Sequence, residues 1–191
     1  MHRRFLYATV LCLLGAAASP CIAAKSPNLE LFGHTLQGAQ RDALRATFKQ
    51  HGMREIRLGN RHSHDVYDAT AVLDGASQFQ VGYVPASQQF AYAQYTFPGF
   101  MKMELVGHVI RMVSSKYGPP TTQTGNYKLG KVSATWQMHK GMEVRVHRDW
   151  PDTTTYLSFT DKAAYRSLQA ESTAHEQQRM RQKALSQSHA F

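Results

Sequence analysis

The organisation of the chain can be read from residues 95–120, YTFPGFMKMELVGHVIRMVSSKYGPP. The end of a strand comes first, Pro98 and Gly99 interrupt it, and a helix begins near Lys102. The helix is predicted because apolar residues recur at helical spacing and form one broad stripe: Leu105, Val106, Val109, Ile110, Val113 and Tyr117. Gly118 and two prolines then end it, since glycine favours the left-handed C-terminal position and proline cannot continue a helix. On either side of this stretch the chain reads as a helix followed by a meander of strands.

The part before this stretch predicts a helix over residues 39–51 and then an antiparallel meander. In the helix, Ala43, Leu44 and Phe48 form the apolar side, and Arg41 is among the charged residues expected on the solvent side. Strands are expected at residues 53–57, 66–73, 79–83 and 90–97, with tight turns at Asp74-Gly75 and at Pro85. Small alanine and glycine residues in these strands leave room for a neighbouring element to pack closely.

The part after Pro120 predicts a polar loop over residues 121–127 and then three strands. These strands are expected at residues 132–138, 142–147 and 155–159, joined by turns at Lys140-Gly141 and Trp150-Pro151. Asp161 is expected to cap a last helix whose apolar residues extend over only two turns. Residues 171–191 have little to bury, so we expect a polar, protruding tail.

Landmarks that lie 66 residues apart suggest two tandem units. A glycine closes each helix, a glycine lies in each first hairpin turn and a proline lies in each second turn: Gly52 and Gly118 (118 − 52 = 66), Gly75 and Gly141 (141 − 75 = 66), Pro85 and Pro151 (151 − 85 = 66). At this spacing Val81 corresponds to His147, so the middle strands disagree about which side is buried. The expected fold is one α+β domain over residues 25–170, an antiparallel sheet backed by helices, with units at 31–98 and 99–161.

This tandem arrangement resembles, in architecture, the helix-plus-sheet modules of beta-lactamase inhibitory protein. The run KYGPP (residues 116–120), a later strand with Trp136, and a closing strand with Asp161 before a polar helix also resemble a loose class of small exported proteobacterial proteins. That resemblance covers residues 100–170, and most of the class has no assigned function. It implies export and an α+β fold, and it carries over no catalytic residue.

The N-terminus has the layout of a secretory signal peptide. Two arginines near the start precede an uncharged, largely apolar run over residues 5–24, which ends in small residues. We expect removal of residues 1–24 by cleavage after Ala24, and a periplasmic or secreted protein. The strongly apolar part, through residues 11–14, is too short to span a bilayer comfortably and is bounded by a processing site, so no transmembrane anchor is expected. Lipidation of Cys21 is disfavoured because Pro20 occupies the position where a lipoprotein signal needs a small residue.

The expected mature chain lacks cysteine and is basic. Cleavage would remove both cysteines, which excludes disulfides, thiol nucleophiles and thiolate metal sites. It would leave 22 − 2 = 20 Lys and Arg residues against 13 acidic residues, a net charge of +7. This charge favours anionic partners, which in the envelope include acidic proteins, peptidoglycan and lipopolysaccharide. Nucleic acid is not expected, because the basic residues are scattered rather than clustered in a stripe.

His62 and His64 are the candidate metal ligands. Within RHSHD (residues 61–65) a strand would place both imidazoles on one face, and neutral imidazole binds zinc or copper. A third ligand would have to come from a distant position such as His139 or His147. The competing interpretation is a polar turn that leads into the next strand.

Motifs of catalysis and of cofactor binding are missing from the sequence. It contains no Gly-x-Ser-x-Gly nucleophile elbow, no glycine-rich phosphate loop and no dinucleotide fingerprint. The neighbouring aspartates, Asp65 with Asp68 and Asp149 with Asp152, flank strands or turns, where aspartate commonly makes local hydrogen bonds. We therefore predict no catalytic residue and no cofactor.

The leading functional hypothesis is a non-catalytic binding protein of the cell envelope, such as an inhibitor or an immunity protein. Helices on one side of a sheet leave the other face open, and here that face would carry polar and aromatic side chains. Arg145, His147, Trp150 and Tyr156 are predicted to contact a protein partner, because arginine and aromatic residues most often anchor interfaces. The alternative is a metal-binding or metal-dependent envelope protein centred on the two candidate histidines.

Overall fold

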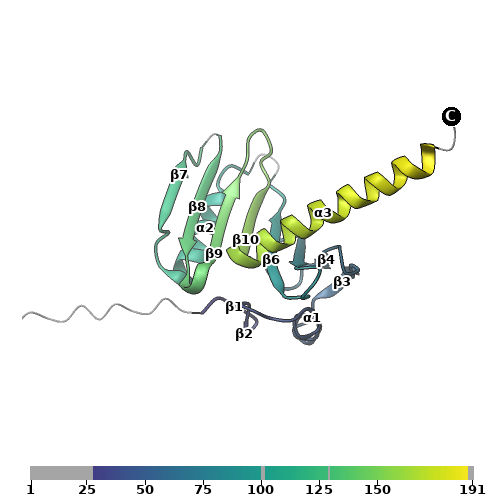
Figure 1. Cartoon of the computed structure of the whole chain (residues 1–191). Coiled ribbons are helices and arrows are strands. Elements are labelled where there is room, and N and C mark those ends of the chain that lie inside the picture. The colour runs from purple at the N-terminus through teal and green to yellow at the C-terminus, as the bar shows by residue number, and fades with distance from the viewer. Residues whose placement is uncertain (1–27, 100–101, 129, 189–191) are drawn as a thin grey trace, which may run out of the picture.

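The chain folds around one large antiparallel sheet. Figure 1 shows a computed structural model, in which residues 28–99, 102–128 and 130–188 are described. Within the described residues there are an eight-stranded sheet, a two-stranded hairpin and three α-helices, so the predicted α+β class is confirmed. The predicted signal peptide, residues 1–24, lies outside the described residues.

The elements alternate in chain order between one helix and a group of strands. Up to the centre they are β1 (Glu30–Leu31), β2 (His34–Thr35), α1 (Arg41–Gln50), β3 (Arg54–Arg57), β4 (Asp65–Asp68), β5 (Gln78–Tyr83) and β6 (Phe90–Phe97). They continue with α2 (Leu105–Tyr117), β7 (Thr122–Gly125), β8 (Val132–Gln137), the 3-10 turn η1 (His139–Gly141), β9 (Met142–Arg148), β10 (Thr155–Asp161) and α3 (Lys162–Gln187).

Two similar units share the sheet. Its strand order is β3-β4-β5-β6-β10-β9-β8-β7, so each unit supplies four consecutive strands that run in chain order from one edge of the sheet to its centre. One unit begins with α1 and the other with α2, as predicted. The units meet where β6 pairs antiparallel with β10, from Phe97 opposite Thr155 to Tyr92 opposite Thr160. Any site at the middle of the sheet therefore draws residues from both units.

The core lies between one face of the sheet and the helices α1 and α2. The ring of Phe48 in α1 lies 5.4 Å from the ring of Tyr67 and 5.3 Å from that of Phe79. From α2, the predicted apolar stripe supplies buried side chains at Val106, Val109, Ile110 and Val113. Burial of one such side chain contributes roughly 1.5–3 kcal/mol, so this face of the sheet is committed to the fold.

The buried faces of the two units correspond with a small shift. Phe79 and Val81 of β5 are buried, and so are Val144 and Val146 of β9, which gives a spacing of 144 − 79 = 65. The conflict between Val81 and His147 at a spacing of 66 therefore comes from one residue of register. The turn landmarks and the strand interiors follow different spacings.

Two segments differ from the prediction. The strand expected at residues 66–73 ends at Asp68, whose carboxylate accepts hydrogen bonds from the backbone N–H of Thr70 at 2.9 Å and from its hydroxyl at 2.6 Å, and so starts a turn. The polar loop expected at residues 121–127 contains β7, an edge strand whose four residues are all exposed. An edge strand with both faces in solvent shows no apolar alternation, which is why the hydropathy pattern did not reveal it.

The expectation that Arg41 faces solvent is wrong. Its side chain is buried, with 4% of the residue exposed, and Nη2 donates to Asp65 Oδ1 at 2.7 Å and to the carbonyl of Gly59 at 2.9 Å. A buried charge is tolerated only with such partners. Because the partners lie 18 and 24 residues away, the helical pattern of α1 could not indicate them.

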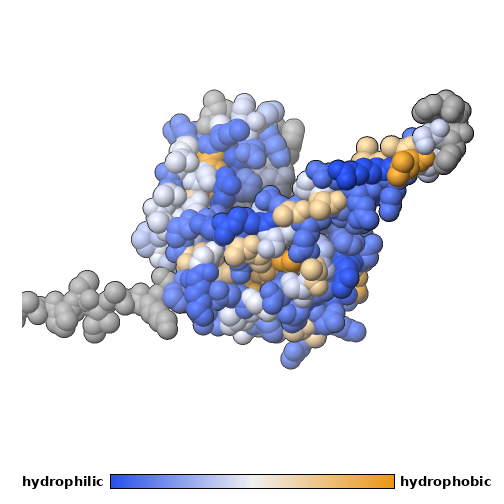
Figure 2. Space-filling model, in the orientation of Figure 1, coloured by the Kyte–Doolittle hydropathy of each residue, from blue (hydrophilic) through white to orange (hydrophobic). Residues whose placement is uncertain are grey.

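The last helix, α3, begins on the sheet face opposite α1 and α2 and then leaves the body of the protein (Figure 1). Asp161 caps it as predicted, since Oδ1 accepts from the backbone N–H groups of Ala163 and Ala164, both at 3.0 Å. The protruding part has a mostly hydrophilic surface (Figure 2), and none of the described α3 side chains is buried. Along the part of the chain that the structure describes, no helix has both the length and the apolar content needed to cross a membrane.

Candidate functional site

The sheet face opposite α1 and α2, called the open face below, carries mostly polar side chains. Successive strand residues point to opposite faces, so the pairing register arranges the outward side chains in rows across the sheet. One row crosses five strands in the order Gln80, Gln94, Ser158, Arg145 and Thr135. The row joins the two units, since its first two residues belong to one and its last three to the other.

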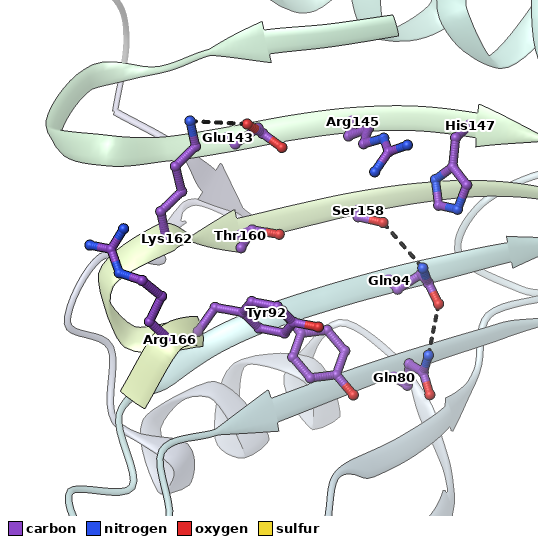
Figure 3. Close-up of a pocket in the computed structure, with 11 residues that line it drawn as sticks. Gln80, Tyr92, Gln94, Glu143, Arg145, His147, Ser158, Thr160, Lys162 and Arg166 are labelled. Atoms are coloured by element: carbon purple, nitrogen blue, oxygen red, sulfur yellow. Dashed lines mark hydrogen bonds and ion pairs between the residues drawn. The ribbon is translucent and has the colours of Figure 1, made fainter. Parts of the chain in front are cut away.

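A cavity of about 590 Å³, called the open-face cavity below, lies on this face beside the first turns of α3 (Figure 3). Its walls come from β5, β6, β9, β10 and α3: Gln80, Tyr92, Gln94, Glu143, Arg145, His147, Ser158, Thr160, Lys162, Tyr165 and Arg166. Two of the four predicted partner-binding residues, Arg145 and His147, are among them.

A glycine positions one wall of the cavity. Gly82 on β5 lies opposite Tyr92 on β6, and a Cβ at residue 82 would lie 2.1 Å from Cε1 of Tyr92. The Tyr92 ring therefore occupies the space that a side chain at this position would need, and Tyr165 of α3 packs edge-on against it with ring centroids 5.6 Å apart. Burial and the neighbouring Tyr165 raise the pKa of Tyr92, so its phenol stays protonated at neutral pH. The close packing predicted from small residues is confirmed here.

A directed chain of hydrogen bonds runs along the floor of the cavity. Gln80 Nε2 donates to Gln94 Oε1 at 2.8 Å, and Gln94 Nε2 donates to Ser158 Oγ at 3.2 Å (Figure 3). Because Ser158 Oγ accepts in this chain, its own proton is available to donate elsewhere. The chain therefore presents a hydroxyl donor at its end.

Cationic groups outnumber anionic ones around the cavity. Glu143 is the acidic side chain of the lining, and its carboxylate pairs with Lys162 Nζ at 3.1 Å and accepts from Gln137 Nε2 at 2.8 Å. Arg145 uses Nε to donate to Ser133 Oγ at 3.1 Å, and within the described residues its two Nη groups have no hydrogen-bond partner. Arg166, also in the lining, adds a third cation to Lys162 and Arg145.

His147 stays uncharged beside these cations. Burial lowers its pKa and the nearby Arg145 lowers it further, against a smaller opposing effect of Asp149. Its ring stacks on Tyr156 with centroids 5.1 Å apart and planes 25° apart. Among the described residues Nδ1 of His147 is buried without a hydrogen-bond partner. The imidazole therefore acts as a neutral wall at neutral pH.

The other two predicted partner-binding residues lie outside the cavity lining. Tyr156 is paired with His147 across β9 and β10, and its hydroxyl donates to Asp152 Oδ2 at 3.2 Å. Trp150 follows the end of β9 and is 47% exposed, so it extends the same end of the sheet towards solvent. The four predicted residues thus fall into a pair inside the cavity and a pair beside it.

The partner-binding residues predicted from the sequence included none from the first unit or from α3. Alternation in residues 90–97 could have placed Tyr92 and Gln94 on the face opposite Tyr95, because period-two patterns assign faces. The packing of the first turns of α3 on the sheet could not be predicted from a periodic pattern, because the helix has no broad apolar stripe. Lys162, Tyr165 and Arg166 reach the cavity only through that placement.

The candidate metal ligands line a second cavity, of about 260 Å³, but each engages another side chain. His62 stacks on His175 of α3, with ring centroids 4.0 Å apart and planes 10° apart. His64 Nε2 accepts from Arg57 Nη2 at 2.8 Å, and burial together with Arg57 lowers the pKa of His64. No group of three or more His, Cys, Asp and Glu side chains that could hold a metal ion exists among the described residues.

Comparisons with known proteins identify no family for the chain. No protein-family model and no curated protein matches it. Among solved structures it is similar to the crystal structure of a DUF4309 family protein, YjgB, from Bacillus subtilis, at 15% sequence identity and a TM-score of 0.42. That match covers 70% of this chain and 86% of the other chain.

Proposed function

We propose that the protein is an exported, non-catalytic binding protein of the cell envelope, which engages a protein partner through the open face of its sheet. The observation that carries this proposal is the open-face cavity. It gathers donors from both units, whereas the other face of the sheet is buried under α1 and α2. An inhibitor or an immunity protein would act in this way, by covering a surface of its partner.

The hydrogen bonds of the cavity favour binding over catalysis. A nucleophilic hydroxyl needs a general base within about 2.6–3.2 Å. Ser158 Oγ instead accepts from the amide of Gln94, and Nδ1 of His147 has no partner among the described residues. These side chains form a surface of donors rather than a nucleophile with its base.

The proposal is tested with the mature chain, residues 25–191, immobilised and exposed to an envelope extract. A protein that is captured would be identified, purified and titrated against two variants. Arg145→Ala with Tyr156→Ala alters the open face, and Lys49→Ala on α1 removes one positive charge from an exposed position. We expect the double variant to bind at least tenfold more weakly and Lys49→Ala to bind like the wild type. Equal binding by all three proteins would remove the open face from the proposal.

A second candidate is a histidine-based metal-binding envelope protein. The observation that favours it is that His62 and His64 line one cavity. Under this candidate, zinc or copper would raise the melting temperature of the mature protein, and His62→Ala with His64→Ala would abolish the shift. An unchanged melting temperature in the presence of either metal would reject it.

A further inference from the structure

We propose that the open-face cavity receives a carboxylate, the side chain of an aspartate or a glutamate of the partner, and that Arg145 and Ser158 hold it. This inference rests on the proposed function, because it names the group of the partner that enters the face. It follows from the charge of the cavity, the direction of its hydrogen bonds and the adjacency of its free donors.

The charge of the cavity calls for an anion. Three cationic side chains (Arg145, Lys162 and Arg166) and one acidic side chain (Glu143) line it, a formal balance of 3 − 1 = +2. Glu143 is already neutralised by Lys162 at 3.1 Å. An anion that enters the cavity therefore meets two further cations and no unpaired carboxylate in the lining.

The direction of the hydrogen bonds calls for a group that only accepts. The chain from Gln80 through Gln94 ends on Ser158 Oγ, which leaves the hydroxyl proton to donate. An ionised carboxylate offers about four acceptor positions and no donor, so it complements such a set of donors. An amide or a hydroxyl of a ligand also carries N–H or O–H groups, which would face the donors of the cavity without an acceptor.

The free donors are also adjacent. Ser158 and Arg145 are directly opposed in the pairing of β10 with β9, which places neighbouring side chains about 4.5–5.5 Å apart at Cβ. Arg145 is fixed by the bond from Nε to Ser133 Oγ at 3.1 Å, and its Nη groups stay free among the described residues. Two Nη donors and one hydroxyl match the two oxygens of a single carboxylate, and hydrogen bonds to an ionised acceptor are the stronger kind.

A single acidic side chain of a protein fits this cavity better than a polyanionic chain does. The donor set is compact, with one arginine fork and one hydroxyl, and the floor beyond it is closed by the bonded pair Gln80 and Gln94. The Tyr92 ring and α3 bound the cavity on the other side. A single carboxylate on a short side chain satisfies the donors without a track of charges along the sheet.

The test is an NMR titration of the ¹⁵N-labelled mature protein that follows the Nε–H signal of Arg145 and the side-chain amide signals of Gln80 and Gln94. The probes are a blocked tetrapeptide of glutamate, the matched tetrapeptide of glutamine, and inorganic phosphate. We expect saturable shifts of these signals with the glutamate peptide, at least tenfold weaker binding of the glutamine peptide, and weaker binding of phosphate. Equal binding of the two peptides would overturn the inference, and so would tighter binding of phosphate, which would assign the site to phosphate groups.

Two variants assign the effect to the fork of Arg145. Arg145→Gln is expected to weaken binding of the glutamate peptide at least tenfold. Arg145→Lys keeps the charge but loses the two-pronged guanidinium, so its affinity for the peptide is expected to lie between those of the wild type and Arg145→Gln. Lys49→Gln, charge-matched and on α1, is the control and should bind like the wild type. If Arg145→Gln binds the peptide as well as Lys49→Gln does, the carboxylate inference fails.

Failure of the inference and failure of the proposed function give different results. Loss of partner capture in the open-face double variant, together with no response to the glutamate peptide, would reject the carboxylate and keep the binding face. A response to the peptide together with unchanged partner capture would keep the carboxylate site and reject the face as the partner surface.

Discussion

In each unit of the sheet a buried arginine holds an equivalent loop by hydrogen bonds, but the groups that accept those bonds differ between the units. In the first unit Arg41, 4% exposed, binds Asp65, which is fully buried, together with carbonyls of the loop between β3 and β4. In the second unit Arg148, 1% exposed, reaches the loop between β7 and β8, and its five hydrogen bonds all end on backbone carbonyls. One loop depends on an ion pair and the other on neutral acceptors.

This difference shows that the units share topology without sharing the chemistry of their supports. Asp65 collects Arg41, Arg45 and the backbone N–H of Gly59 at 2.7–2.9 Å. The carbonyls around Arg148 bear no charge that can be titrated. The stability of the first unit should therefore respond to the loss of one carboxylate and to pH, and the second unit should not.

The largest effect is expected from Asp65→Asn. The substitution leaves Arg41 and Arg45 without their anionic partner, and removal of one member of a buried pair costs about 3–5 kcal/mol. Urea unfolding measures the loss. Asp68→Asn is the control, because the Arg54 side chain of its ion pair is 80% exposed and solvent screens such pairs, so a much smaller loss is expected. A loss below about 1 kcal/mol for Asp65→Asn would mean that both loops are held by neutral contacts alone.

A smaller loss is expected from Arg148→Met. Methionine keeps the apolar stem but leaves carbonyls of residues such as Met103 and Gly130 without their donor, and an unsatisfied buried group costs about 1–3 kcal/mol. We expect about 2–3 kcal/mol in urea unfolding. Arg145→Met, on the same strand with an exposed side chain, should change stability by less than about 0.5 kcal/mol. Equal losses in the two variants would remove the structural role of Arg148.

Acid should open the loop between β3 and β4 before it opens the loop between β7 and β8. Burial alone would raise the pKa of Asp65, but the hydrogen bonds from Arg45, Arg41 and the Gly59 N–H outweigh burial and lower it below the usual value. A carboxyl whose pKa is lowered by folding contributes stability above its unfolded pKa, about 3.9, and loses that contribution as pH falls through the folded pKa. Hydrogen exchange, corrected for intrinsic rates, should show residues 58–65 opening as the pH falls below about 4, before Asn126 and Tyr127 do. Simultaneous opening would contradict the difference.

The smallest effect is expected from His175→Ala. The stack of His62 on His175 ties α3 to the first unit, and an aromatic pair of this kind is worth about 0.5–1.5 kcal/mol. The global free energy of unfolding should change by less than about 1 kcal/mol, while exchange of the backbone amides after residue 172 should become faster. Gln182→Ala, farther along α3 and exposed, serves as the comparison. Unchanged exchange would show that the stack does not hold the helix.

The sequence predicted the elements that one local period defines. The stripe of α2 and its stop at Gly118 emerge as predicted, and alternation along residues 142–147 placed Arg145 and His147 on the open face. These predictions succeed because the buried side of a regular element repeats at a fixed interval.

The parts that were missed depend on partners distant in sequence or on no burial at all. Arg41 is buried by Asp65, 24 residues away, and β7 has no buried residue to mark it. The position of α3 over the cavity depends on single contacts, such as Tyr165 against Tyr92 and Glu171 accepting from the Ala86 N–H at 2.8 Å. Contacts of this kind leave no periodic trace in the sequence.

Oxidative footprinting of residues 25–191, free and bound to a partner captured as proposed above, tests the open face most directly. Binding through the open face predicts protection of Tyr92 in the first unit and of His147 and Tyr156 in the second. Phe32 and Met112, which line a cavity on the helix side, should be oxidised equally in both states. Protection of Phe32 and Met112 with Tyr92 and Tyr156 unchanged would contradict the open face as the binding surface.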